Sequence, residues 1–189
     1  MVKTVFLDRD GTINVDNGYT YKVEDFYFEK NVIPALKLLQ GHGFELIIVT
    51  NQSGIGRGLF TMGDFRKFNN HLINQLEIRE IKILKTYFSP YHPEKGIGKY
   101  KKITQCRKPN PGMLEQAEKD FYIDKNMSWI VGDKWTDVKT GNNFGIKSIL
   151  IQSKNKSSDT NNCSAQADFI TNDILEAAKF IINYQNDKT

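Results

Sequence analysis

Two aspartates, Asp8 and Asp10, directly follow the first apolar run of the chain, residues 5–7. Side chains alternate along an extended segment, so residues two apart point the same way. Gly11 then allows a sharp turn. In such a pair, one carboxylate can attack phosphorus while the other handles the proton of the leaving group. The spacing therefore favours a covalent phosphoryl-transfer site over an acidic turn after a strand.

Three later segments carry polar side chains beside expected strands or helices. Residues 50–56 offer a hydroxyl and backbone amides that can hold phosphoryl oxygens. Lys108 can supply a fixed positive charge, and Asp133 can bind a metal, with Asp137 one helical turn later to orient its neighbours. Taken one at a time, these segments also suit a polar turn, a solvated lysine and a helix N-cap at Asp133.

The charges of these residues explain why they belong together. Asp8, Asp133 and a phosphate dianion carry about four negative charges, and each like-charge pair at 4 Å costs about 4 kcal/mol at an effective dielectric of 20. A divalent cation and Lys108 offset this repulsion. Mg²⁺ prefers an all-oxygen shell of carboxylates, carbonyls, phosphate and water. The sequence therefore predicts a magnesium-dependent site.

Apolar runs and amphipathic segments alternate along the chain. Strands are expected at residues 2–7, 44–50, 83–88, 128–131, 147–151 and 167–170. Helices are expected at residues 32–40, 64–80, 111–121, 135–143 and 173–184. This alternation predicts an α/β fold with a doubly wound, Rossmann-like parallel sheet. Such sheets bind ligands beyond the carboxyl ends of their strands, and the polar motifs follow three of those ends.

Length and composition narrow the class of protein. The 189 residues and 39% hydrophobic content fit a single domain, 1–189. Without a run of 18 apolar residues or an N-terminal signal, we expect a cytoplasmic protein with no membrane partner. Cys106 and Cys163 are the only cysteines, which argues against a disulfide framework. The net charge is +4, and much of it lies in a basic loop at 89–109, which suits a phosphate pocket better than a nucleic-acid surface.

The motifs, in this order, resemble those of the haloacid-dehalogenase superfamily. A narrower resemblance rests on DRDGTIN, D-x-G-Y, TNQSGIGRG, CRKPNPGM and VGDK, and runs over roughly residues 3–151. These segments are similar to the family of D-glycero-D-manno-heptose 1,7-bisphosphate 7-phosphatases. DRDGT, TNQSG and CRKP also occur in histidinol-phosphate phosphatases, so the motifs indicate the chemistry more specifically than the substrate.

The resemblance implies catalytic and metal-binding roles for the matching residues. Asp8 would be the nucleophile, and Asp10 the general acid and then the base for water. Asp8, Asp133 and the backbone carbonyl of Asp10 would bind Mg²⁺. Thr50 and Lys108 would steady the transferring phosphoryl group.

The resemblance also implies substrate contacts. Among them, Arg107 would clasp the second, anomeric phosphate, because its planar fork matches phosphate oxygens. The full set is Arg9, Asp16, Asn17, Gly18, Tyr19, Asn51, Gln52, Ser53, Arg107 and Lys134.

One segment departs from the family pattern. Relatives commonly carry a zinc loop with C-P-H and then C-x-C directly before R-K-P. This chain has Ser89 and Tyr91 at the first pair of ligand positions and Thr104 and Cys106 at the second. A structural zinc site normally needs four nitrogen or sulfur ligands, so no zinc is expected.

We therefore expect a phosphatase that hydrolyses the 7-phosphate of the heptose bisphosphate through an aspartyl-phosphate, within ADP- or GDP-heptose biosynthesis. The connection at 11–31 is too short for a folded cap, so no large cap domain is expected, and the open pocket suits a small sugar bisphosphate handled by a monomer. Histidinol-phosphate phosphatase and nucleic-acid 3′-phosphatase are alternatives on the same core. A non-catalytic phospho-ligand-binding protein is a further alternative, against which the full catalytic set argues.

Overall fold

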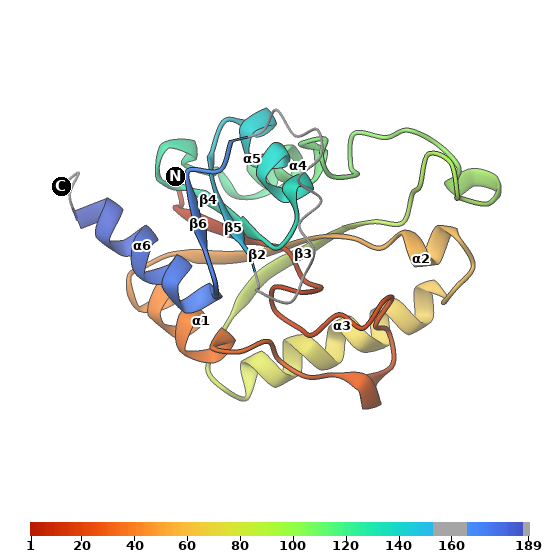
Figure 1. Cartoon of the computed structure of the whole chain (residues 1–189), viewed down its shortest axis with the longest axis horizontal. Helices are drawn as coiled ribbons and strands as arrows, with labels where there is room; N and C mark the ends of the chain where they lie inside the picture. The colour runs from red at the N-terminus through yellow and green to blue at the C-terminus, as the bar shows by residue number, and fades with distance from the viewer. Residues whose placement is uncertain (153–165, 187–189) are drawn as a thin grey trace.

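The computed structural model describes residues 1–152 and 166–186. Within these ranges, six strands form one sheet (Figure 1). They are β1 (Thr4–Leu7), β2 (Glu45–Asn51), β3 (Ile83–Ser89), β4 (Trp129–Gly132), β5 (Lys147–Ile151) and β6 (Phe169–Thr171). The strand order is β3-β2-β1-β4-β5-β6, and every neighbouring pair runs parallel. The predicted doubly wound α/β fold is confirmed.

Helices cover both faces of this sheet. They are α1 (Val32–Gly41), α2 (Ser53–Gly56), α3 (Met62–Glu77), α4 (Gly112–Phe121), α5 (Trp135–Phe144) and α6 (Ile174–Asn186), with 3₁₀ turns η1 (Val23–Asp25), η2 (Gly98–Tyr100) and η3 (Lys125–Met127). Figure 1 shows α1 and α3 on one side of the sheet and α4 and α5 on the other. Among the described residues, none of these helices is long and apolar enough to cross a bilayer.

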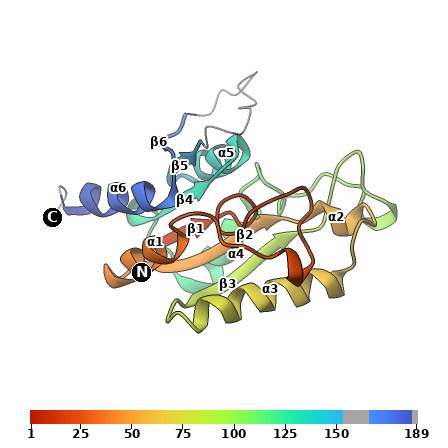
Figure 2. The same ribbon diagram turned by 60° about the horizontal axis from the view of Figure 1, so that its bottom comes forward.

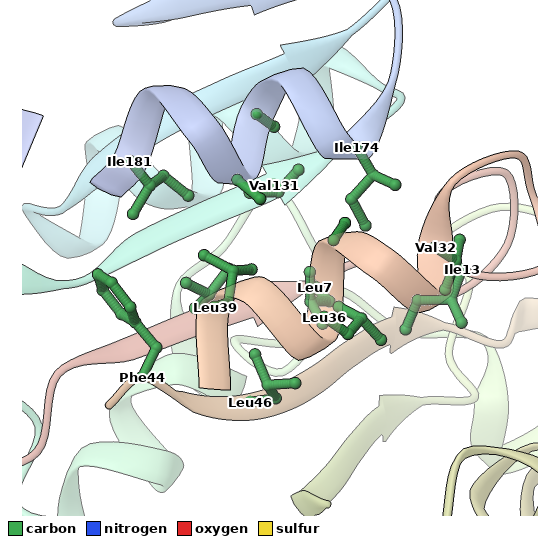
Figure 3. Close-up of a cluster of buried hydrophobic side chains, with 14 of the residues drawn as sticks. Leu7, Ile13, Val32, Leu36, Leu39, Phe44, Leu46, Val131, Ile174 and Ile181 are labelled. Atoms are coloured by element: carbon green, nitrogen blue, oxygen red, sulfur yellow. The ribbon is translucent and has the colours of Figure 1, made fainter. Parts of the chain in front are cut away.

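The core lies on both faces because side chains in each central strand alternate. In β1, Val5 and Leu7 pack with α1 and α6, whereas Phe6 packs with α4 and α5 on the opposite face. Figure 3 shows the first cluster, in which Leu36 of α1 and Ile174 of α6 meet the sheet. Full burial of each such side chain stabilises the fold by about 1.5–3 kcal/mol. This packing fixes the strand ends that carry the polar motifs.

Most expected elements match the observed ones within a few residues. Helix α3 begins two residues before its expected start, because Thr61 and Asp64 form a capping box: the Thr61 hydroxyl accepts from the Asp64 amide (3.1 Å), and the Asp64 carboxylate accepts from the Thr61 amide (2.8 Å). Helix α2 was not expected, since four residues are too few to show periodicity. The expected polar loop at 153–165, with Cys163, lies outside the described residues.

Two connections flank the carboxyl edge of the sheet. The segment 11–31 contains the single turn η1 and packs against α3, where Phe26 contacts the rings of Phe68 (5.7 Å between centroids) and His71 (5.1 Å). The basic loop 89–109 runs beside α2, as Figure 2 shows. There the amide of Ile97 donates to the carbonyl of Gly56 at 2.8 Å.

Candidate active site

A small pocket opens at the carboxyl ends of β1, β2 and β4. Its walls come from all four predicted motifs, which the parallel strands bring to one edge of the sheet. The residues that line it are Asp8, Asp10, Thr50, Asn51, Lys108, Lys134 and Thr136. Thr136 was not predicted from the sequence; its position in the first turn after β4 was the available signal.

Lys108 stands at the centre of a buried ionic cluster. Its Nζ lies 2.7 Å from Oδ1 of Asp8 and 2.6 Å from Oδ1 of Asp137, and it donates to the carbonyl oxygen of Val49 at 2.8 Å. An ammonium group has three hydrogens, and these three oxygens match them in number. The side chains of all three ion-paired residues are almost completely buried. A buried ion pair fixes geometry strongly, because removing one partner leaves an uncompensated charge.

The cluster also sets the protonation state of its members. Burial alone favours a neutral Asp8, but the ammonium groups of Lys108 and Lys134 outweigh it and lower the pKa of Asp8 below its usual range. Asp8 is therefore a carboxylate, the form that can act as a nucleophile. Burial, followed by the carboxylate of Asp8, raises the pKa of Asp137 to about 7. The pKa of Lys108 is raised, since Asp137 and Asp8 overcome the effect of burial.

Asp137 reaches this cluster from the first turn of α5. Its Oδ2 accepts a hydrogen bond from the amide of Lys134 at 3.2 Å, which caps the helix. A Cβ on Gly132 would lie 2.3 Å from that same oxygen, so only glycine leaves room for the carboxylate. The helix N-cap is Lys134, so the alternative of Asp133 as N-cap is wrong.

Three carboxylates at this edge can hold a cation. One ligand atom from each of Asp8, Asp133 and Asp137 lies within 4.8 Å of the others. Asp8 and Asp133 were the predicted side-chain ligands, and Asp137 was predicted only to orient its neighbours. A set of donors that are all oxygens, at the carboxyl edge of the sheet, fits a hard divalent cation such as Mg²⁺.

Asp10 occupies the other side of the pocket and has a different environment. Its Oδ1 accepts from Arg9 Nε (3.0 Å), Arg9 Nη2 (2.9 Å) and Asn14 Nδ2 (3.1 Å). Its Oδ2 accepts from Arg9 Nη2 (3.0 Å) and Gln52 Nε2 (2.6 Å). The same Gln52 nitrogen donates to the Thr50 hydroxyl at 2.9 Å. Asp10 is thus held by hydrogen bonds beside the hydroxyl that was predicted to steady the phosphoryl group.

Three predicted substrate contacts have other partners in the structure. Arg9 is 1% exposed and lies behind Asp10 rather than in the pocket wall, which does not fit a substrate contact. The side-chain amide of Asn51 pairs with the backbone of Lys108 in both directions, at 3.0 and 3.1 Å. Gln52 is buried and bridges Asp10 and Thr50. These three side chains therefore contact Asp10, Thr50 and the backbone of Lys108, and of the three only Asn51 also lines the pocket.

The loop at 16–19 lies outside the pocket wall. The carboxylate of Asp16 accepts from the amide of Gly18 at 3.0 Å, and its charge helps to raise the pKa of Lys134. Tyr19 is 42% exposed, and the guanidinium of Arg57 lies 5.0 Å from its ring centroid. Arg57 was not among the predicted site residues, and its contact with Tyr19 is seen only in the structure.

Of the remaining predicted contacts, Lys134 lines the pocket and Ser53, Asn17 and Arg107 do not. Ser53 is buried at the start of α2, and the backbone amide of Asn17 donates to the Thr20 hydroxyl at 3.2 Å. Lys134 lines the pocket, and its Nζ is 3.7 Å from Oδ1 of Asp133. Arg107 is half-buried, and its Nη1 donates to the carbonyl of Tyr91 at 2.9 Å. Arg107 is not part of the pocket wall, so the anomeric phosphate that it is predicted to bind would lie outside the pocket.

In the loop where no zinc was expected, Ser89, Thr104 and Cys106 form a hydrogen-bonded cluster. Cys106 Sγ lies 3.2 Å from Thr104 Oγ1 and donates to Ser89 Oγ at 3.6 Å. The nearby His92 accepts from the amides of Glu94 and Lys95 through Nδ1, at 3.2 and 3.0 Å. One thiol and two hydroxyls are a poor donor set for zinc. These residues do not fit the structural zinc of related loops.

A doubly wound sheet with a buried aspartate–lysine pair at its carboxyl edge defines the class of haloacid-dehalogenase-type (HAD) hydrolases. A family model described as HAD-hydrolase-like matches residues 105–177. A curated D-glycero-beta-D-manno-heptose-1,7-bisphosphate 7-phosphatase from Yersinia pestis is 38% identical over 182 residues, which cover 95% of each chain. The chain belongs to the family of that phosphatase.

Solved structures agree with this placement. A HAD-like phosphatase from Mesorhizobium loti is 30% identical, with a TM-score of 0.81 over 95% of this chain and 87% of its own. A D,D-heptose 1,7-bisphosphate phosphatase from B. bronchiseptica, complexed with magnesium and phosphate, has a TM-score of 0.80 over 97% and 99% of the two chains. At 21% identity, the second structure shows the shared fold.

Proposed function

We propose that this chain is a phosphatase that removes the 7-phosphate of D-glycero-D-manno-heptose 1,7-bisphosphate. The observation that carries the proposal is the ionised, buried Asp8, which shares one pocket with Asp10 and Lys108 in a member of this family. A buried carboxylate beside a lysine suits attack on a phosphoryl group whose charge the lysine offsets.

The first half of the reaction transfers the phosphoryl group to the protein. A carboxylate oxygen of Asp8 forms a bond to phosphorus while the bond from phosphorus to the sugar oxygen breaks. Asp10 gives a proton to that leaving oxygen, and the sugar departs as an alcohol. Lys108 and the Thr50 hydroxyl hold the non-bridging oxygens as charge develops on them.

The second half restores the protein. Asp10, now a carboxylate, takes a proton from water, and the water oxygen attacks the phosphorus of the aspartyl-phosphate. The bond between phosphorus and Asp8 breaks, which releases inorganic phosphate and regenerates the carboxylate. The proton that Asp10 lost in the first half is thereby recovered.

We propose Mg²⁺ as the cation of the acidic cluster. The side chains of Asp8 and Asp133 and the carbonyl of Asp10 would hold it, and Asp137, whose oxygens pair with Lys108 and the Lys134 amide, would orient the neighbouring groups. When bound, it neutralises phosphate charge and allows the anionic nucleophile to approach. With Lys108, it supplies the positive charge that this cluster of carboxylates needs. We propose no role for zinc in the reaction or in the fold.

Substrate specificity is assigned to the rim of the pocket. The loop at 16–19 and Lys134 face the sugar, and Arg107 in the basic loop 89–109 binds the anomeric phosphate. We propose that residues 1–189 act as one domain and as a monomer in the cytoplasm, on a small sugar bisphosphate rather than on nucleic acid. The choice of substrate rests on the activity of the curated relatives and on the small pocket.

A phosphate-release screen tests the proposal. Purified protein with Mg²⁺ is given both anomers of the heptose 1,7-bisphosphate, histidinol phosphate and a 3′-phosphorylated oligonucleotide, with Asp8→Asn as the inactive control. We expect the highest kcat/KM on one bisphosphate anomer, and phosphorus NMR of the product should show the anomeric phosphate retained. Preference for histidinol phosphate or the oligonucleotide, or no release at all, would contradict the assignment.

A further inference from the structure

Resting on the proposed function, we propose that Arg9 is a positioning residue that orients Asp10 for proton transfer. The guanidinium donates to Asp10 through two nitrogens: Nε and Nη2 contact Oδ1 at 3.0 and 2.9 Å, and Nη2 also contacts Oδ2 at 3.0 Å. A planar fork on a planar carboxylate fixes the rotation of that carboxylate as well as its distance.

Arg9 is itself held rigidly from the side away from the pocket. Its Cζ lies 4.8 Å from the ring centroid of Phe68 and 5.5 Å from that of Phe65, both in α3. Nη2 also donates to the carbonyl of Thr20 at 3.4 Å, in the connection that follows β1. Aromatic faces attract a desolvated cation, so a charge that is only 1% exposed has partners on several sides.

The two oxygens of Asp10 are not equivalent in this arrangement. Oδ1 accepts from Arg9 twice and from Asn14, and none of these three donors comes from the pocket wall. Oδ2 accepts once from Arg9 and once from Gln52, whose same nitrogen donates to the Thr50 hydroxyl in the pocket. The geometry therefore assigns proton transfer to Oδ2, with Oδ1 as the fixed oxygen.

The chain order explains why this residue can serve Asp10 without touching substrate. Asp8 and Asp10 face the pocket, so the residue between them projects the opposite way. Its guanidinium lies against Phe65 and Phe68 of α3 and donates to Asp10 from there. A small misplacement of a group that transfers a proton can cost on the order of 10²-fold in rate.

The test compares two leaving groups. Arg9→Lys keeps the charge but loses the fork, and kcat and KM are measured on an alkyl phosphate and on p-nitrophenyl phosphate. A nitrophenolate leaves without protonation, so the role of Asp10 in the first half is largely bypassed. We expect kcat/KM, which reports the first half alone, to fall about 10- to 100-fold on the alkyl phosphate. This is at or below the lower end, about 10²-fold, of what general acid catalysis contributes, because Asp10 itself is still present. The loss on the aryl phosphate should be several-fold smaller, with KM nearly unchanged on both.

Two further variants separate positioning from folding. Phe68→Leu removes one ring beneath the guanidinium but leaves its polar contacts. Its loss of activity should again be greater on the alkyl phosphate than on the aryl phosphate, but smaller than the loss caused by Arg9→Lys. In an Asp10→Asn background, Arg9→Lys should add no further loss, because its effect passes through Asp10. Arg79→Lys is the matched control, since Arg79 also lies over a phenylalanine, Phe28 at 5.4 Å, away from the pocket wall.

The outcomes are distinct. An inactive wild-type protein would contradict the proposed function and the role of Asp10 with it. An active wild type in which Arg9→Lys lowers kcat/KM equally on both substrates would overturn the positioning role alone. A further loss in the Asp10→Asn background would also overturn it, because Arg9 would then act through another group.

Discussion

Lys108 and Arg107 are neighbours in the chain but belong to regions held in different ways. The ammonium of Lys108 is buried between two carboxylates, at 2.7 and 2.6 Å. The guanidinium of Arg107 is half-buried and donates to a neutral backbone carbonyl, that of Tyr91. The pocket is therefore organised by ion pairs at the ends of rigid strands, whereas the contacts described for residues 89–107 of the basic loop include hydrogen bonds to neutral groups.

This difference suggests a division of labour. Ionic contacts in a buried site are costly to break and fix atoms closely, which suits the chemical step. Single hydrogen bonds between neutral groups, such as those joining Ser89, Thr104 and Cys106, contribute little each, so a loop that they hold should tolerate substitution. Changes in the pocket should therefore affect kcat on every substrate, and changes in the loop should depend on which substrate is tested.

The largest effect is expected from Asp8→Asn. The substitution keeps the shape of the side chain but removes the nucleophilic charge, so turnover should fall by at least about 100-fold on every phosphomonoester. Steady-state phosphate release measures it, with thermal unfolding to check the fold. A covalent route also predicts that beryllium fluoride protects wild-type protein against unfolding and does not protect the variant. Retention of more than a few per cent of the wild-type rate would show that another residue is the nucleophile.

The acidic side of the pocket should also control stability in the absence of metal. The pKa of Asp137 is raised to about 7, whereas an unfolded aspartate has a pKa of about 3.9. Between these values the native state binds the extra proton, so the unfolding free energy should fall as the pH rises from about 4 to about 7. Asp137→Asn removes this titration and keeps an oxygen that can cap α5.

Urea unfolding in chelator at pH 5 and pH 7.5 measures this effect. Between pH 5 and pH 7.5 the unfolding free energy of wild type should fall more than that of Asp137→Asn, because only wild type carries this titration. Asp120→Asn is a matched control: hydrogen bonds from Lys85 and Tyr87 lower the pKa of Asp120, so its linkage lies below this window. If the unfolding free energy changed equally with pH in wild type and in Asp137→Asn, Asp137 would not be the group with the raised pKa.

The two regions also differed in how far the sequence predicted them. The parallel-sheet rule placed the motifs after the first, second and fourth strands at one edge, as observed. Lys108 lies 100 residues from Asp8 and precedes a helix, and only the charge argument and the motif resemblance joined it to them. The alternation that placed Asp8 and Asp10 on one side also directs Arg9 to the other, but the motif resemblance had assigned it to substrate. The pairing of Asn51 with the Lys108 backbone depends on the distance between two loops, which no local pattern encodes.

In the loop, Arg107→Ala should act on one class of substrate. Loss of a charged hydrogen bond costs about 1.5–3 kcal/mol, which corresponds to about 10- to 150-fold in kcat/KM. The loss should appear for the heptose bisphosphate and largely vanish for a heptose 7-monophosphate, which lacks the anomeric phosphate. Lys101→Ala, an exposed change in the same loop, controls for net charge. Equal losses on both substrates would mean that Arg107 serves the reacting phosphate or the fold.

The smallest effect is expected from Cys106→Ser. The thiol contacts two hydroxyls, Thr104 Oγ1 and Ser89 Oγ, and serine can form similar hydrogen bonds. The unfolding free energy should change by less than about 1 kcal/mol, and activity only modestly through the adjacent Arg107. Metal analysis of protein purified without chelators should find no stoichiometric zinc, because hydroxyls replace the thiolates that a structural site needs. Zinc bound near one equivalent in wild type and lost in Cys106→Ser would show that this loop depends on a metal after all. The contrast between an ionic pocket and a neutral loop would then fail, because both regions would be organised by charge.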